Sequence, residues 1–235
     1  MTVRQLLTSL VPILLALIFL FSITTAFAYY TQQADWQQTS VNWHRVLKLF
    51  DLRHENTLAT WFSSVVFLTA GIGFVLLGWG HAQTYIISRF RRLSFQAIAV
   101  ALFFLSADEV GSVHETIGSW FERKVIIWEG VHGMGFSWLL IFAPFALFAF
   151  GICIWQLSAV IKSLPEYQAR WNATALLILA CFLLPSVLGL EALQGYWILT
   201  KQGETFSTSL EEAFELLGIY SLFITTLIIA RQYKL

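Results

Sequence analysis

The segment Leu58–Gly80, LATWFSSVVFLTAGIGFVLLGWG, decides the fold class, because it is a long apolar run without one charged residue. A helix needs about 20 such residues to cross the ~30 Å hydrocarbon core of a bilayer. Runs of similar character lie near residues 6–30, 93–117, 135–160, 171–193 and 209–230. The sequence therefore predicts an all-α, polytopic bundle of about six transmembrane helices, formed by one integral membrane domain over residues 1–235.

The composition supports this class and excludes others. Hydrophobic residues make up 57% of the chain and charged residues only 12%, whereas soluble domains carry about 25% charged residues. The net charge is zero and no basic block occurs, so we expect no nucleic-acid partner. Cys153 and Cys181 both lie inside apolar runs, which argues against a disulfide framework or a zinc knuckle. The expected surroundings are a lipid bilayer.

The distribution of Lys and Arg predicts the orientation. With the N-terminus inside, eight of these residues lie on the inner side and six on the outer side. The positive-inside rule then places both termini in the cytoplasm, as for a multi-pass protein of a bacterial inner membrane. The polar segment 31–56 becomes an outer loop that can include an interfacial helix.

Acidic residues gather toward one end of four predicted spans. Ionisable groups at membrane depth are rare unless they pair, face a cavity or bind an ion, so this clustering predicts a functional site. Ten of the fourteen acidic residues belong to the group: Asp108, Glu109, Glu115, Glu122, Glu129, Glu191, Glu204, Glu211, Glu212 and Glu215.

The helical rise gives the depth of these carboxylates. Asp108 lies sixteen residues after Arg92, and Glu215 lies sixteen residues before Arg231. Each interval corresponds to ~24 Å of helix, short of the far edge of a ~30 Å core. Asp108 and Glu215 are therefore the strongest candidates for intramembrane carboxylates, while Glu191 lies nearer the boundary by the same measure.

The helical phase selects among the candidates. Asp108 and Glu115 are seven residues apart and project from nearly one face of a continuous helix, whereas Glu109 is rotated by about 100° from it. His114 is rotated by a similar angle in the other direction and reaches in from the side. The predicted site contains Asp108, Glu115, Glu191, Glu211 and Glu215 with His114, and its outer candidates are Glu55, Glu129 and His132.

These side chains indicate metal chemistry. Carboxylates from several helices with an imidazole resemble the ligand sets of carboxylate-bridged metal sites, which suit Fe, Mn or Zn. The Glu-x-x-His spacing typical of such sites occurs once, at Glu129 and His132. We expect a metal-dependent enzyme acting on a lipid or other apolar substrate, with Asp108, Glu115 and Glu215 as acid, base or ligand groups.

Other interpretations remain open. Thr208–Glu212 contains two overlapping capping boxes, so Glu211 and Glu212 could serve only to start a helix. The carboxylates could form structural hydrogen bonds in an accessory or scaffold subunit of a larger membrane complex. Carboxylates at matching depth could also share protons and form a proton or cation pathway.

Three segments resemble a bacterial family of uncharacterised multispanning membrane proteins. They are Glu55–Ser64 (ENTLATWFSS), Ser106–Glu115 (SADEVGSVHE) and Leu210–Glu215 (LEEAFE). This resemblance covers most of the chain and implies a six-helix type of membrane protein without implying an activity.

A second similarity is to the alkaline ceramidase and progestin/adiponectin-receptor superfamily of membrane hydrolases. That group combines an early Glu-x-Asn, a Ser, an Asp and three zinc-binding His residues. Here Glu55 and Asn56 lack the spacer, and no closing His-x-x-x-His is present. His114 and His132 alone are well placed, so the resemblance hints at metal chemistry without supplying a full ligand set.

Overall fold

The computed structural model describes residues 12–25, 57–84, 89–113, 116–117, 136–196 and 201–233. These residues form helices and no strand. The elements are a helix at Pro12–Thr25 followed by α3 (Leu58–Thr84), α4 (Arg89–Gly111), α6 (Phe136–Lys162), α7 (Tyr167–Tyr196) and α8 (Lys201–Gln232). Five of them are long and apolar enough to cross a membrane. The predicted all-α membrane bundle is thereby confirmed.

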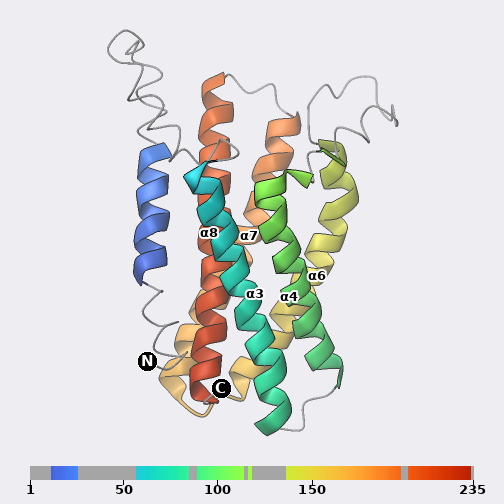
Figure 1. Ribbon diagram of the computed structural model, residues 1–235, viewed down its shortest axis with the longest axis vertical. Coiled ribbons are helices and arrows are strands. Elements are labelled where there is room, and N and C mark those ends of the chain that lie inside the picture. Colours follow the sequence, from blue (N-terminus) through green and yellow to red (C-terminus); the bar gives the residue numbers. More distant parts are fainter. Residues whose placement is uncertain are drawn as a thin grey trace.

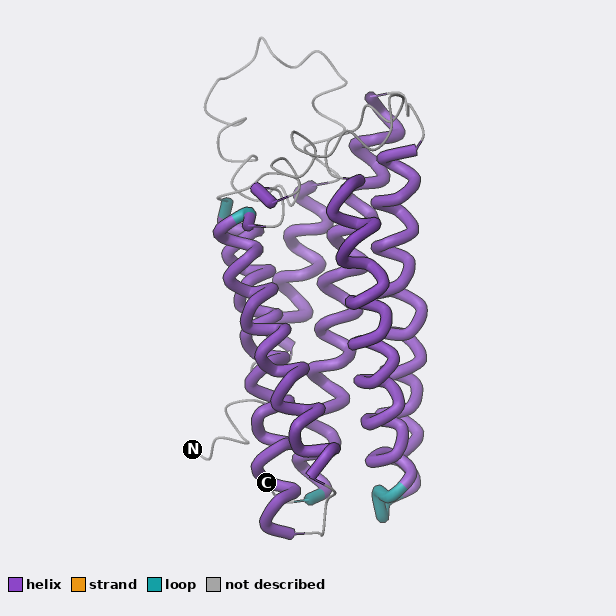
Figure 2. Tube along the Cα trace, turned by 90° about the vertical axis from the view of Figure 1, so that its right-hand side faces the viewer, coloured by secondary structure: helices purple, strands orange, loops and turns teal. Residues whose placement is uncertain are grey.

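The long helices lie side by side along one axis (Figures 1 and 2). Successive helices alternate in direction, and α3 and α8 run the same way through the middle of the bundle. In these two helices 56% of the spanning window is buried, compared with 28% in α6 and 22% in α7. The central pair therefore supplies most of the interior, and α6 and α7 expose most of their surface toward the position of the lipid.

Alternate faces of α3 show how the sequence produces this arrangement. Phe67 and Phe74 are fully buried and point into the bundle, where Phe74 packs on Phe95 of α4 at a centroid distance of 6.0 Å. Trp61 and Ile72 lie on the opposite face and are exposed. The outward face is hydrophobic because it contacts lipid. Since lipid is as apolar as these side chains, the inward face is held against its neighbours by van der Waals packing and not by the hydrophobic effect.

Small residues allow two of the helix contacts to be close. A Cβ added to Gly73 of α3 would collide with the Thr226 hydroxyl oxygen of α8, and one added to Gly218 would stand 2.7 Å from the Leu184 side chain of α7. Small residues at helix interfaces are the usual means by which transmembrane backbones approach each other. Gly73 and Thr226 therefore fix the relative height of α3 and α8.

Two helix boundaries differ from the sequence prediction with consequences for the site. α4 was expected to continue to residue 117, but it ends at Gly111, because Ser112 adopts a left-handed conformation with φ 46°. α8 begins at Lys201, well before the predicted start at residue 209. Thr208–Glu212 therefore lies inside a helix, so the capping-box interpretation of Glu211 and Glu212 is wrong.

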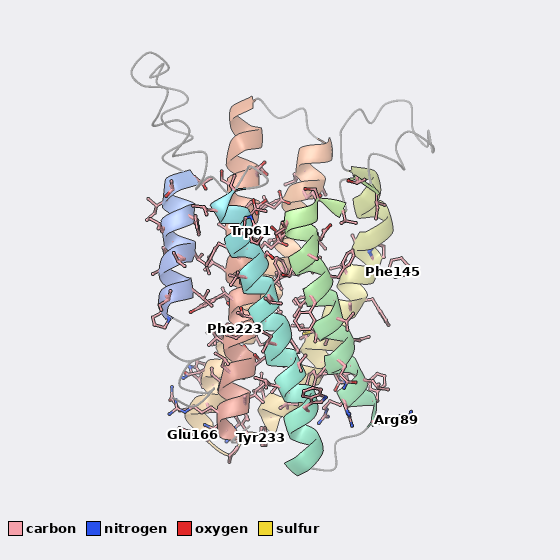
Figure 3. The ribbon with its side chains drawn as sticks, viewed as in Figure 1. Trp61, Arg89, Phe145, Glu166, Phe223 and Tyr233 are labelled. Atoms are coloured by element: carbon pink, nitrogen blue, oxygen red, sulfur yellow. The ribbon has the colours of Figure 1, made fainter. Side chains whose placement is uncertain are left out.

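Polar contacts join the helices at the end marked by Arg89, Glu166 and Tyr233 in Figure 3. The Gln232 side-chain amide donates to the Glu166 carboxylate at 2.6 Å, and the Ser163 and Tyr233 hydroxyls lie 2.9 Å apart. Trp61 marks the opposite end in the same view. The bundle thus has two distinct ends, and the acidic residues of α4, α7 and α8 lie toward the end of Trp61.

Candidate functional site

Glu215 is the centre of a group of carboxylates that comes from three helices. Its side chain is half-buried on α8. It interacts electrostatically with Glu109 of α4, Glu191 of α7, and Glu211 and Glu212 of α8. We call these five residues the carboxylate cluster. They bring like charges together at a depth where water screens charge poorly, so the cluster attracts protons or cations.

The carboxylate that α4 contributes is Glu109, which the sequence analysis left out of its preferred set. Glu109 lies seven residues after Leu102 and fourteen after Phe95, and both of these are buried. Residues seven apart share a helix face, so Glu109 follows the buried stripe of α4. This spacing was the signal in the sequence that could have identified it.

Asp108 directly precedes Glu109 on α4. Its side chain is buried, with 7% of its surface exposed, but it is not among the groups that act on Glu215. The proposed alignment of Asp108 with Glu115 assumed an uninterrupted helix, and the left-handed Ser112 between them removes that assumption. Of the residues predicted for the site, the structure therefore brings together Glu191, Glu211 and Glu215.

The close helix contacts show which part of α3 lies level with the cluster. Gly73 of α3 contacts Thr226 of α8, and the two helices run in the same direction. Eleven residues earlier on each helix, about three turns, α3 has Phe62 and α8 has Glu215, so these two residues lie at similar depth. On α4, Ser106 pairs with Ser64 of α3, and Glu109 follows less than one turn later. Residues 62–64 of α3 therefore lie at the depth of Glu215 and Glu109.

Ser63 is the polar residue of α3 that faces the interior at this depth. Its side chain is 2% exposed, and its hydroxyl oxygen has no hydrogen-bond partner within the described part of the chain. Ser64 faces α4 and Gly73 faces α8, so at 100° per residue Ser63 points between these two helices. An unpaired buried hydroxyl costs about 1–3 kcal/mol, which calls for a functional explanation. We include Ser63 in the candidate site.

Aromatic side chains close the interior beyond the cluster. Phe67, Phe74, Phe95 and Phe223 are the largest side chains that are fully buried. Figure 3 shows Phe223 about midway between the two ends of the bundle. This apolar layer separates the carboxylate cluster from the polar contacts of the opposite end. The cluster therefore belongs to a one-sided site.

The metal prediction remains a prediction. Among the residues that the structure describes, no group of three or more His, Cys, Asp or Glu side chains is arranged to hold a metal ion. Five of the predicted donors, Glu55, His114, Glu115, Glu129 and His132, lie outside the described residues. Both histidines of the predicted site are in this group, so the structure bears only on its carboxylates.

Comparison with known proteins identifies one family. A family model described as a domain of unknown function (DUF8692) matches residues 10–230. The match covers all the helices that carry the carboxylate cluster and Ser63. No curated protein and no solved structure matches the chain.

Proposed function

The chain belongs to the DUF8692 family, whose description names no activity, and from the geometry of its own carboxylates we propose that it is a membrane-embedded, metal-dependent enzyme. Its substrate would be a lipid or another apolar molecule. The observation that carries this proposal is the electrostatic interaction of Glu215 with Glu109 and Glu191, which belong to two other helices. A bound divalent cation would neutralise this concentration of negative charge.

The ligand chemistry favours Fe, Mn or Zn. Carboxylate oxygens from facing helices are the ligands of metal sites in helical bundles, and histidine nitrogen completes many of them. His114 and Glu115 follow Glu109 by five and six residues in the sequence and are the proposed further donors. A metal held by these residues would supply activation of water or oxygen, and Asp108, which directly precedes Glu109, would act as an acid or base.

The place of the cluster supports an apolar substrate. Glu215 and Glu191 both belong to helical segments with the hydropathy of membrane spans. A lipid can approach such a group from within the bilayer, which a water-soluble substrate cannot do. With the orientation predicted from Lys and Arg, the site would face the outer side of a bacterial inner membrane.

The alternatives receive less support from the structure. A proton or cation pathway needs a continuous polar route through the bundle. Beyond the cluster the interior holds large buried Phe side chains, and the buried hydroxyls of Thr225 and Thr226 donate to carbonyls of their own helix. A scaffold subunit needs its buried polar groups only for structural hydrogen bonds, yet the Ser63 hydroxyl has none among the described residues. Both features favour a one-sided site that binds a ligand.

Metal analysis of the protein purified in mild detergent tests the proposal. We expect stoichiometric Fe, Mn or Zn in the wild type and loss of most of it in Glu109→Gln and Glu215→Gln. Glu166→Gln is the matched control, because Glu166 is an exposed glutamate at the opposite end. A wild type without stoichiometric transition metal, or full metal content in both cluster variants, would overturn the proposal.

A further inference from the structure

A shallow, open hollow lies on α7 at the end of the bundle opposite the carboxylate cluster. A surface pocket of about 260 Å³ is lined by Tyr167, Arg170, Trp171 and Thr174, all from the first two turns of α7. Tyr167 and Trp171 are largely exposed, at 72% and 61%. Tyr and Trp at the end of a membrane span are typical of the interface between lipid headgroups and acyl chains. The pocket is therefore placed where a lipid headgroup would be.

Arg170 is the charged group of this pocket. Its Nε atom is buried and has no hydrogen-bond partner among the described residues. The side-chain contact that the structure does show is with the Tyr167 ring, whose centroid lies 5.9 Å from the guanidinium carbon. A guanidinium has five donors in a rigid plane, which match the oxygens of a phosphate or carboxylate. The guanidinium thus lies near an aromatic ring, and because its Nε is buried, the donors for an anion at the surface would be those of its two terminal nitrogens.

The nearest acid in the sequence does not neutralise Arg170. Glu166 lies four residues earlier, and its carboxylate accepts a hydrogen bond of 2.6 Å from Gln232. The contact between Glu166 and Arg170 is through the backbone, where the Arg170 amide donates to the Glu166 carbonyl at 3.1 Å. The Glu166 carboxylate therefore bonds to Gln232, and its residue meets Arg170 through the backbone.

We propose that this pocket binds the phosphate group of an anionic membrane phospholipid. Arg170 would donate to the phosphate oxygens, and the Thr174 hydroxyl, one turn further along the same face, would donate as well. Tyr167 and Trp171 would pack against the glycerol and upper acyl chains. Basic pockets at membrane interfaces bind anionic headgroups in this way. The site is independent of the carboxylate cluster and of any reaction there.

Native mass spectrometry of the purified full chain tests this assignment. Phosphatidylglycerol would be added to delipidated protein in mild detergent, and bound lipid would be counted as a function of concentration. We expect saturable binding to the wild type and about tenfold weaker binding to Arg170→Gln, as for loss of a charge-assisted hydrogen bond. Arg170→Lys keeps the charge without the planar donors and should fall between the two.

Arg231→Gln is the matched control, because Arg231 is an exposed arginine in the last turn of α8 at the same end. Its lipid binding should stay within about twofold of the wild type, because binding depends on one pocket and not on net charge. Equal losses in Arg170→Gln and Arg231→Gln, or no loss in either, would overturn the proposal.

A separate arm distinguishes the lipid from a soluble source of the same chemistry. Inorganic phosphate would be titrated in place of the lipid and as its competitor. Arg170-dependent binding of phosphatidylglycerol that millimolar phosphate leaves intact supports a lipid ligand. Arg170-dependent binding of inorganic phosphate without lipid binding overturns the lipid assignment.

Discussion

Ser64 and Ser106 hydrogen-bond to each other's backbone across the contact between α3 and α4. The Ser64 hydroxyl donates to the Ser106 carbonyl at 2.7 Å, and the Ser106 hydroxyl donates to the Ser64 carbonyl at 2.8 Å. The two hydroxyl oxygens are 2.9 Å apart. This reciprocal pair fixes the height of α3 on α4, which places Ser63 level with Glu109.

The first prediction concerns this pair. Ser106→Ala should lower the free energy of unfolding by about 1 kcal/mol, because an interhelical hydrogen bond is lost in the membrane. Ser64→Ala should lower it by a similar further amount in the double variant, since each hydroxyl donates to a backbone carbonyl that alanine retains and the two substitutions remove different bonds. Unfolding in SDS, followed by circular dichroism, measures both effects. Ser186→Ala serves as the control, because Ser186 bonds only within its own helix, to the Phe182 carbonyl.

The second prediction concerns the contact between α3 and α8. Gly73→Ala should destabilise the bundle by about 1–3 kcal/mol, because the new methyl group collides with the Thr226 side chain. Gly151→Ala should be neutral or stabilising by up to about 1 kcal/mol, since nothing lies within 4 Å of its added Cβ and alanine is the better helix former. Adding Thr226→Ala should recover part of the loss in Gly73→Ala. Equal stability of the Gly73→Ala and Gly151→Ala variants would contradict the close approach.

The positions of the helices follow well from the sequence, because hydropathy reports the length of a membrane span. The predicted span 135–160 became Phe136–Lys162, and the predicted span 171–193 became Tyr167–Tyr196. The observed helices are longer than the predicted spans because a helix can continue beyond the hydrocarbon core of the bilayer, where its backbone hydrogen bonds still form. The first predicted span, 6–30, is described only at residues 12–25.

The site followed less well from the sequence. Assigning residues to a helix face from their spacing requires an unbroken helix. No residue pattern in SADEVGSVHE predicts the left-handed conformation of Ser112. An unbroken helix places Asp108 and Glu115 on one face and Glu109 about 100° away, so the sequence favours Asp108 over Glu109. Ser63 was also missed, because a serine in an apolar span gives no sign of whether its hydroxyl finds a partner.

The third prediction separates the two roles of Ser63. Ser63→Ala should leave the fold unchanged or stabilise it by about 1 kcal/mol, because it removes a buried hydroxyl without a partner. The same variant should bind metal more weakly if the hydroxyl belongs to the site. SDS unfolding and metal titration of one preparation give both readouts. A destabilised Ser63→Ala with unchanged metal binding would assign the hydroxyl a purely structural role.

The fourth prediction concerns metal removal. Dialysis against a chelator should lower the thermal unfolding temperature of the wild type, because a ligand bound only to the folded state stabilises it. Ligand at about 100 times its Kd contributes about 2.7 kcal/mol. Glu215→Gln should be insensitive to the chelator, and Glu166→Gln should respond as the wild type does. A chelator effect of equal size in Glu215→Gln would show that the metal binds elsewhere.

The fifth prediction uses the repulsion within the carboxylate cluster. In metal-free protein, Glu215→Gln should raise the unfolding temperature at neutral pH, because it removes a carboxyl group whose charged form is disfavoured by burial first and by four neighbouring carboxylates second. Glu191→Gln should raise it less, since Glu191 has the weakest of the four interactions with Glu215. Differential scanning fluorimetry in detergent at low salt measures the difference. Unfolding temperatures that match the wild type in both variants would indicate that the carboxylates do not repel each other.

The central position of α8 has a consequence for biosynthesis. α8 packs against both α3 and α7, and it completes the buried face of α3 that carries Phe67 and Phe74. Four long helices leave the ribosome before it does. Until α8 is inserted, α3 can pack on α4 but not on α8, so the interior of the bundle is completed last. Polypeptides halted before residue 201 should therefore be recognised by membrane proteases as incomplete.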